Sequence, residues 1–331
     1  MTISALLADL RINPSGHAYT ARAVPGWTDV YLGVSISGQP CLFVTADGQS
    51  SDPPLRTAKV ALRLSQEFNL DVGSGASRHL LHSLSCESSQ RVDVETFVTL
   101  VEALLARYQG TSIEGADLTA FFRSLVRLFS VPAVRDLAAE RQGLWGELFV
   151  MRQLRGFGFW APRWHSEVTR AFDFSAATRR VEVKTTAGAQ RVHQFSHRQI
   201  RALPGEEIVI ASVLLREDDA GVSLQTLIGD ARNALLGTPD FLKLETAVRR
   251  AGMEDSAISG PAYDLGAARG LLAWFRADEA PQFRMPEPPG VSETRYKVDL
   301  STAPQLAEGE LHMWLDQFAI GQAGGPAVAF S

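Results

Sequence analysis

Residues 181–186 read Val-Glu-Val-Lys-Thr-Thr, a run in which apolar and charged side chains alternate before two threonines. Such alternation over a short stretch is typical of a β-strand. Because successive side chains of a strand point to opposite faces, Glu182 and Lys184 share one face and the two valines take the other. The strand therefore presents a carboxylate and an ammonium group together, with an apolar surface behind them.

A second acidic residue extends this pattern. Asp173 lies nine positions before Glu182, within the strand-like run 171–175 (AFDFS). Two carboxylates and one ammonium group are costly to place on such a sheet unless they have a partner. A divalent metal ion is the natural partner, and carboxylates around such an ion are the outline of phosphodiester-cleaving chemistry.

The segments around these two strands predict an α/β core. A helix begins near Pro132 and runs to about Arg155. After the second strand, Ser196 can cap a short helix, and residues 207–215 (EIVIASVLL) form the nearly continuous apolar run of a strand buried on both faces. The order helix, strands, helix, strand predicts a mixed sheet flanked by helices.

The rest of the chain predicts two flanking regions. Residues 1–112 hold short strand-like runs divided by turn signals, and end in a helix that Asp93 caps. Residues 221–331 mix helical and strand-like segments with a proline-rich connector at 281–289. We therefore expect a β-rich N-terminal domain, a core over residues 113–220, and a mixed C-terminal region.

The composition is that of an ordinary globular protein, with 331 residues, 45% hydrophobic and 21% charged. A formal charge of -5 gives no global footprint of nucleic-acid binding, so any such binding must rest on a local patch. The two cysteines, Cys41 and Cys86, make no disulfide framework and no CxxC zinc site, which fits a reducing compartment. No apolar run approaches the roughly 18 residues of a membrane span, and the N-terminus has no basic segment. We expect a cytoplasmic protein with no membrane partner.

Hydrolysis of a phosphodiester needs a nucleophilic water, stabilisation of charge on the phosphoryl oxygens, and help for the leaving group. Mg²⁺ held by carboxylate and backbone oxygens supplies much of this and keeps several waters. Asp173 and Glu182 are the candidate ligands, with the backbone carbonyl of Val183 as a third oxygen, and Mn²⁺ is an alternative ion. Lys184 would orient or deprotonate the water, or neutralise the developing charge.

Glu147 is a fourth candidate. It lies in the helix before the strands, with Leu144 at i−3 and Met151 at i+4, so its carboxylate falls on or beside the inward stripe of that helix. Gly143 and Gly146 in the same helix allow close approach of backbone or substrate.

Glu147 on a helix, Asp173, then Glu182-x-Lys184, a helix and an apolar strand together resemble the PD-(D/E)XK restriction-endonuclease-like superfamily. The pattern is similar in particular to bacterial "PD-(D/E)XK motif" proteins of unassigned function encoded near phage-defence genes, most specifically over residues 131–216. The resemblance implies a restriction-endonuclease-like core. It implies that Asp173 and Glu182 are metal ligands, Lys184 is the catalytic lysine, Glu147 is the helix-borne acid, and Gln199 is a polar active-site residue. Phe172 stands where the motif's name has a proline, a departure that is common in the superfamily.

A basic cluster supports nucleic acid as the substrate. Between residues 179 and 201, six Lys and Arg side chains stand against one acid, Glu182. Besides Lys184, the candidate phosphate contacts are Arg179, Arg180, Arg191, His193, His197, Arg198 and Arg201. Such a stripe can follow the phosphates of DNA, and binding should then weaken steeply with salt.

Each motif also has a simpler explanation. Asp173 and Lys184 alone could form an exposed cross-strand ion pair, and Glu147 could be a surface residue at the edge of its stripe. The arginines could be a solvated helix face. The two histidines fit local hydrogen bonds or phosphate contacts better than metal ligation.

The sequence thus predicts a Mg²⁺-dependent endonuclease that hydrolyses DNA, with a restriction or anti-phage role implied by the resemblance. A non-cleaving nucleic-acid-binding or scaffold subunit of a defence complex stays open, as does a nuclease that is active only inside a larger complex. DNA is the expected partner, and a homodimer or other defence-system proteins stay open as further partners.

Overall fold

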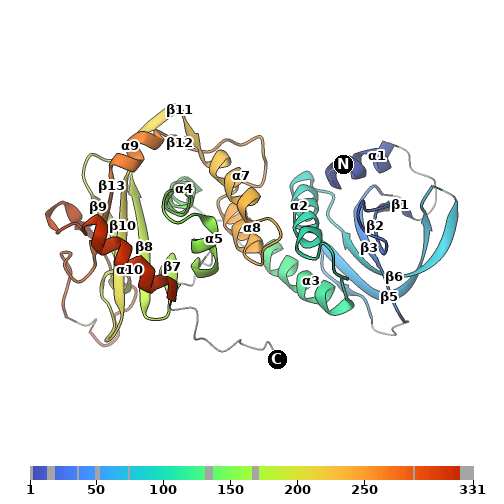
Figure 1. Ribbon diagram of the computed structural model, residues 1–331, viewed down its shortest axis with the longest axis horizontal. Coiled ribbons are helices and arrows are strands. Elements are labelled where there is room, and N and C mark those ends of the chain that lie inside the picture. Colours follow the sequence, from blue (N-terminus) through green and yellow to red (C-terminus); the bar gives the residue numbers. More distant parts are fainter. Residues whose placement is uncertain are drawn as a thin grey trace. The chain divides into compact units, whose positions relative to one another are not determined.

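The computed structural model describes residues 3–12, 19–35, 37–48, 53–73, 75–130, 137–165, 171–285 and 288–320 (Figure 1). The chain divides into two compact units. Unit 1 comprises Met1–Pro132 and Leu236–Glu245, and unit 2 comprises Ala133–Leu235 and Thr246–Ser331. The C-terminal region expected from the sequence therefore belongs largely to the same unit as the predicted core.

Unit 1 is built on a closed five-stranded barrel (Figure 1). Its strands are β1 (Tyr19–Ala23), β2 (Val30–Ser35), β3 (Pro40–Thr45), β5 (Val60–Asp71) and β6 (Ala76–Cys86), with the short β4 (Leu55–Arg56) added to β5. Antiparallel pairings run β1-β2-β3-β6-β5, and a parallel pairing of β1 with β5 closes the ring. Tyr19, Phe43 and Phe68 meet edge to face in the barrel core. The sequence predicted short strands here but not their closure.

Three helices accompany the barrel: α1 (Ile3–Ile12), α2 (Arg91–Arg107) and α3 (Gly115–Phe129). Helix α2 has Gln90 as its N-cap, so the prediction that Asp93 caps it is wrong. Asp93 is buried instead, where it accepts a hydrogen bond from Ser88 (2.7 Å) and pairs with Lys59 (3.0 Å). Helix α3 contacts β5 and β6, which places it in unit 1, whereas the sequence division at 112/113 assigned it to the core.

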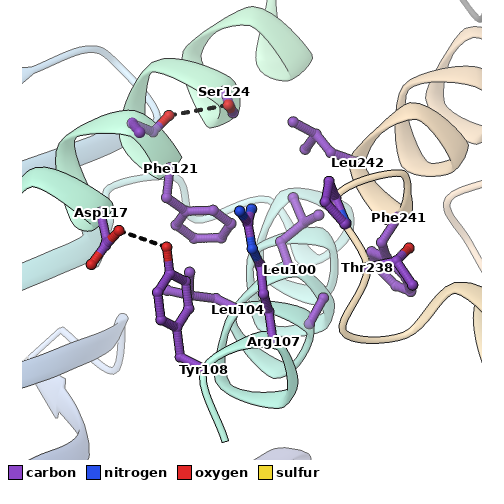
Figure 2. Close-up of a pocket in the computed structure, with 13 residues that line it drawn as sticks. Leu100, Leu104, Arg107, Tyr108, Asp117, Phe121, Ser124, Thr238, Phe241 and Leu242 are labelled. Atoms are coloured by element: carbon purple, nitrogen blue, oxygen red, sulfur yellow. Dashed lines mark hydrogen bonds between the residues drawn. The ribbon is translucent and has the colours of Figure 1, made fainter. Parts of the chain in front are cut away.

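Unit 1 also contains a pocket of about 280 Å³, lined by one face of α2, one face of α3 and residues 238–242 (Figure 2). The Tyr108 hydroxyl donates to the Asp117 carboxylate on its wall (2.6 Å). The side chains of Arg107 and Phe121 point toward each other across the opening (Figure 2). Unit 1 therefore takes part of a pocket wall from a segment that lies far along the chain.

Unit 2 is built on a four-stranded mixed sheet in the order β13-β10-β8-β7. The strands are β7 (Phe174–Ala176), β8 (Arg179–Thr186), β10 (Glu207–Leu214) and β13 (Leu272–Arg276). Strand β8 is parallel to β10, and the two outer pairings are antiparallel. Residues 208–213 of β10 are buried without interruption, as their apolar run predicted.

Helix α4 (Leu137–Gln153) packs against β8 on one face of this sheet (Figure 1). Pro132, where the sequence placed the start of this helix, lies outside the described residues. The approach of helix and strand is close at Gly146, where an added Cβ would lie 2.2 Å from Cγ2 of Thr185. A larger side chain at this position would push helix and strand apart.

The other face of the sheet is covered by a two-stranded ribbon of β9 (Val192–Ser196) and β14 (Arg295–Asp299), and by the short helix α6 (His197–Ile200). Phe195, Ile210, Phe275 and Val298 belong to the core cluster on this side.

The other elements of unit 2 are α5 (Phe157–Trp160), η1 (Ala161–Arg163), β11 (Glu217–Ser223), α7 (Leu224–Leu235), β12 (Ala262–Tyr263), α9 (Leu265–Gly270), η2 (Leu300–Thr302) and α10 (Glu308–Ile320). Helix α8 (Phe241–Arg250) begins in unit 1 and ends in unit 2. Within the described part of the chain, no helix is both long enough and apolar enough to cross a membrane.

Candidate active site

A tight hairpin brings Asp173 beside Glu182. Strands β7 and β8 are antiparallel, with Phe174 paired to Val181. Asp173 lies one residue before β7, not inside the strand that the sequence predicted. The N–H of Val183 lies beyond the last β7 pairing and donates to the Asp173 carboxylate, with N···Oδ2 at 2.7 Å. The early end of β7 thus leaves a strand edge at which a side-chain carboxylate takes the place of a backbone partner.

Glu182, Lys184 and Gln199 form a hydrogen-bonded group on the face away from α4. The Lys184 ammonium lies 2.7 Å from Glu182 Oε1, and Gln199 Nε2 donates to the same oxygen at 2.7 Å. Ser196 caps α6 as predicted and fixes Gln199 through a reciprocal capping box. The Lys184 ammonium also lies 5.1 Å from the centroid of the Phe195 ring. Glu182 is 2% exposed, so this group is a buried charge pair and not a solvated surface pair.

Glu147 approaches from α4 on the opposite face of the sheet. Its carboxylate is buried and accepts a hydrogen bond from the indole N–H of Trp164 at 2.6 Å. Glu147 is therefore not a surface residue, which was the alternative explanation of its position in the sequence. No motif or spacing in the sequence indicates that Trp164 donates this hydrogen bond.

The three carboxylates influence one another electrostatically. Burial, followed by the charge of Asp173, raises the pKa of Glu182 to about 8 and raises the pKa of Glu147 well above its usual range. Burial also raises the pKa of Asp173, although the Lys184 charge and the Val183 N–H act in the opposite direction. Such shifts arise when carboxylates are desolvated close together, because each opposes the ionisation of the others.

The pKa of Lys184 is also raised, but for an ammonium group this favours the charged form. Burial alone would lower the pKa of its ammonium group, but the charges of Glu182 and Asp173 outweigh this and raise the pKa. The side chain therefore keeps its positive charge at neutral pH. Of the roles that the sequence left open for Lys184, neutralisation of developing charge or orientation of a water needs no deprotonated amine.

The donor set fits a divalent cation. Oxygen Oε2 of Glu182 is buried and has no hydrogen-bond partner among the described residues. Within that part of the chain, no three His, Cys, Asp or Glu side chains form a complete metal cage. Mg²⁺ does not need one, because it binds through one or two carboxylates and retains several waters. An unpartnered carboxylate oxygen beside a second acid suits such an ion, while a role for the Val183 carbonyl stays a prediction.

Arg250 and Glu140 are site neighbours that the sequence did not indicate. Arg250, at the end of α8, donates from Nε to Glu140 Oε2 on α4 at 2.7 Å. Burial raises the pKa of Glu147 and of Asp173, and the positive charge of Arg250 offsets part of both rises. No spacing or motif connects residue 250 to the strands, so only the tertiary packing of α8 reveals this contribution.

Two of the candidate phosphate contacts are turned inward. Arg191 donates to the backbone carbonyls of Ser212 (2.8 Å) and Leu271 (2.6 Å). His193 is 4% exposed, and its Nε2 lies 2.7 Å from the Ser212 hydroxyl oxygen. For His193, this is the local hydrogen bonding that the sequence offered as one alternative. The contacts of Arg191 and His193 together hold β9 against β10.

The other basic candidates lie nearer the surface. Arg180 and Arg198 both contact Oε1 of Glu206, at 3.0 and 2.8 Å, and both line a pocket of about 270 Å³ together with His165. Arg179 pairs with Glu207 at 2.9 Å, and the Arg201 guanidinium lies 3.5 Å from His197 Nε2. Contact of these residues with DNA stays a prediction.

The burial of His193 predicts a loss of folding stability at acid pH. Burial, then the charges of Lys184 and Arg191, lowers the pKa of His193 from 6.5 to about 4. The folded state therefore resists protonation of His193, and the stability that this histidine contributes is fully present above pH 6.5. That contribution is lost as pH falls toward 4, by about 1.4 kcal/mol per pH unit. We expect His193→Gln to flatten this part of the pH profile of the unfolding free energy. The exposed His312→Gln should follow wild type, and an unchanged profile in His193→Gln would contradict the assignment.

One comparison with known proteins identifies the family. A family model described as "Putative PD-(D/E)XK family member, (DUF4420)" matches residues 4–301. No curated protein and no solved structure matches the chain. The family points to a nuclease-like role. Because the match spans most of the chain and includes every candidate site residue, the protein belongs to this PD-(D/E)XK family, as the Asp173 and Glu182-x-Lys184 pattern predicted.

Proposed function

We propose that the protein is a Mg²⁺-dependent deoxyribonuclease with a restriction-endonuclease-like core, acting in a restriction or anti-phage system. The observation that carries the proposal is the buried contact of Lys184 with Glu182 (2.7 Å) beside Asp173, with one Glu182 oxygen left without a partner. A purely structural ion pair does not need a third charged group at its side. A hydrolytic site does, because it must hold both a cation and a reacting phosphate.

Each residue of the site has a distinct task in this proposal. Asp173 and Glu182 would hold the metal ion, which when bound supplies charge stabilisation and an activated water. Lys184 holds its proton and places a positive charge where negative charge grows on the phosphoryl oxygens. Gln199 keeps Glu182 Oε1 in place, so that Oε2 stays available to a ligand. Glu147, held by Trp164, adds negative potential from the α4 side.

The pocket beside the hairpin supports DNA as the substrate. Arg180 and Arg198 share a single acid, Glu206, so one positive charge of the pair is left over at the 270 Å³ pocket. Ala171, Phe172 and Ser175, which flank Asp173, line the same pocket. A phosphate there would lie next to the candidate metal ligands, as a neighbouring phosphate of the same strand requires.

Purified protein tests the proposal directly. We expect it to nick or linearise plasmid DNA in Mg²⁺ or Mn²⁺ and to leave the plasmid intact in excess chelator. Addition of Mg²⁺ should also raise the melting temperature of wild type but not of Asp173→Asn, because a ligand that binds only the folded state stabilises it. Cleavage that is equally fast in chelator would refute the metal site. Metal-insensitive DNA binding without cleavage would instead favour a non-cleaving subunit.

A further inference from the structure

The proline-rich connector before β14 carries an exposed aromatic side chain. Phe283 is 64% exposed, although burial of its ring would be favourable by about 2 kcal/mol. It does not stand alone, because its ring meets Tyr296 of β14 edge to face at 4.9 Å. Both rings line a pocket of about 290 Å³ that also includes Pro281 and Val298. The protein thus holds an aromatic surface open toward solvent next to a cavity of the size of a small ring system.

A row of aromatic contacts connects this surface with the candidate active site. Tyr296 is the direct cross-strand partner of Phe195, and such partners on antiparallel strands point to the same side. Phe195 lies under the Lys184 ammonium at 5.1 Å. The Tyr296 hydroxyl also lies 3.4 Å from His197 Nδ1, at the start of the helix that carries Gln199. From Lys184 outward, the order is therefore Phe195, Tyr296 and Phe283.

The charge around these rings favours an anionic partner. Lys297 lines the pocket, and Arg284 and Arg295 directly neighbour the two aromatic residues in the chain. All three are exposed, and none of them forms an ion pair with another described residue. These three cations outnumber the one acid that lines the pocket, Asp299, whose carboxylate accepts a hydrogen bond from the N–H of Ser301. Aromatic faces beside unpaired cations suit a chain of bases and phosphates, because bases stack on the rings while the cations follow the backbone.

We propose that Phe283 and Tyr296 form a stacking platform for an unpaired base of the DNA substrate, so that the protein acts on DNA with a single-stranded segment beside the cleavage position. This inference deepens the proposed function and rests on it. A base inside a duplex has no free face to offer such a platform, whereas a single strand or a frayed end does. A hydrophobic protein segment is the other occupant that the rings could accept, and the test separates the two.

Binding in chelator tests the platform apart from cleavage. We would measure fluorescence anisotropy with a labelled oligothymidylate of about 20 nucleotides, longer than typical single-strand sites, and with a matched duplex. Phe283→Ala should weaken single-strand binding about fivefold to a hundredfold, the range found when one stacking ring is removed. Phe283→Trp should retain it, and duplex binding should change less than twofold.

Met285→Ala is the matched control, because Met285 is 79% exposed, lies in the same connector and does not line the pocket. Equal losses in Phe283→Ala and Met285→Ala, equal losses on single strand and duplex, or no single-strand binding by wild type would each overturn the platform. Phe283-dependent binding without any metal-dependent cleavage would support the platform and refute the nuclease. Metal-dependent cleavage of duplex DNA, unchanged by Phe283→Ala, would support the nuclease and refute the platform.

Discussion

Lys184→Met should reduce metal-dependent DNA cleavage by roughly 10²- to 10³-fold, the range found when one donor to a developing negative charge is removed. The ammonium group lies 2.7 Å from Glu182, and its pKa is raised, because the charges of Glu182 and Asp173 outweigh its burial. Methionine keeps an apolar stem beside Phe195 while it removes the charge. The rate of plasmid nicking at saturating Mg²⁺ is the measurement.

A lysine outside the site provides the control for this substitution. Lys243 pairs with Asp240 at 2.8 Å, and Lys243→Met should keep wild-type activity. Circular dichroism and the melting temperature should show that Lys184→Met is folded. A folded Lys184→Met protein that cleaves at the wild-type rate would mean that the ammonium group has no part in the chemistry, and the site assignment would then fail.

Gly146→Ala should destabilise the packing of α4 against β8. An added Cβ would lie 2.2 Å from Cγ2 of Thr185, far inside van der Waals contact. Thr185 cannot simply rotate away, because its Oγ1 accepts a hydrogen bond from Gln142 at 3.2 Å. We expect a net loss of about 1–3 kcal/mol of stability, even though alanine alone favours a helix over glycine. Cleavage should fall as well, since α4 carries Glu147.

Gly143, one turn earlier in the same helix, is a matched control. A Cβ at that position meets nothing within 4 Å. Gly143→Ala should therefore stabilise the protein by about 0.5–1 kcal/mol, because alanine has the higher helix propensity. Denaturant unfolding of both variants decides the matter. A change of stability in the same direction in both variants would contradict the close contact of α4 with β8.

The chemical pattern of the site could be predicted from the sequence because it is local. Residues 181–186 fix which side chains share a face of β8, and the turn before them brings Asp173 to the same place along the sheet. Ser196 and Gln199 are also a local signal, since a capping box is set by a spacing of three residues. Family membership followed from the same residues.

Long-range packing accounts for what the sequence did not predict. Nothing in a linear pattern indicates that β1 closes a barrel with β5, or that Arg250 lies beside Glu140. Asp93 illustrates a different difficulty, because an acid near a helix start suggests a cap, whereas here Lys59 on a distant segment neutralises it. The division at 112/113 was placed at the largely polar segment 110–115 (GTSIEG). The contacts of α3 with β5 and β6 nevertheless keep that helix with the barrel.

The return of residues 236–245 to unit 1 has a consequence for biosynthesis. Leu100 and Leu104 of α2 line the pocket with Phe241 and Leu242, which leave the ribosome only after β7, β8, β9 and β10. The face of α2 that lines this pocket therefore stays exposed on the nascent chain while most of the second sheet is synthesised. A fragment cut at the first boundary would retain that exposure permanently, so the two halves of this polypeptide are interdependent in assembly and should resist separation into autonomous pieces.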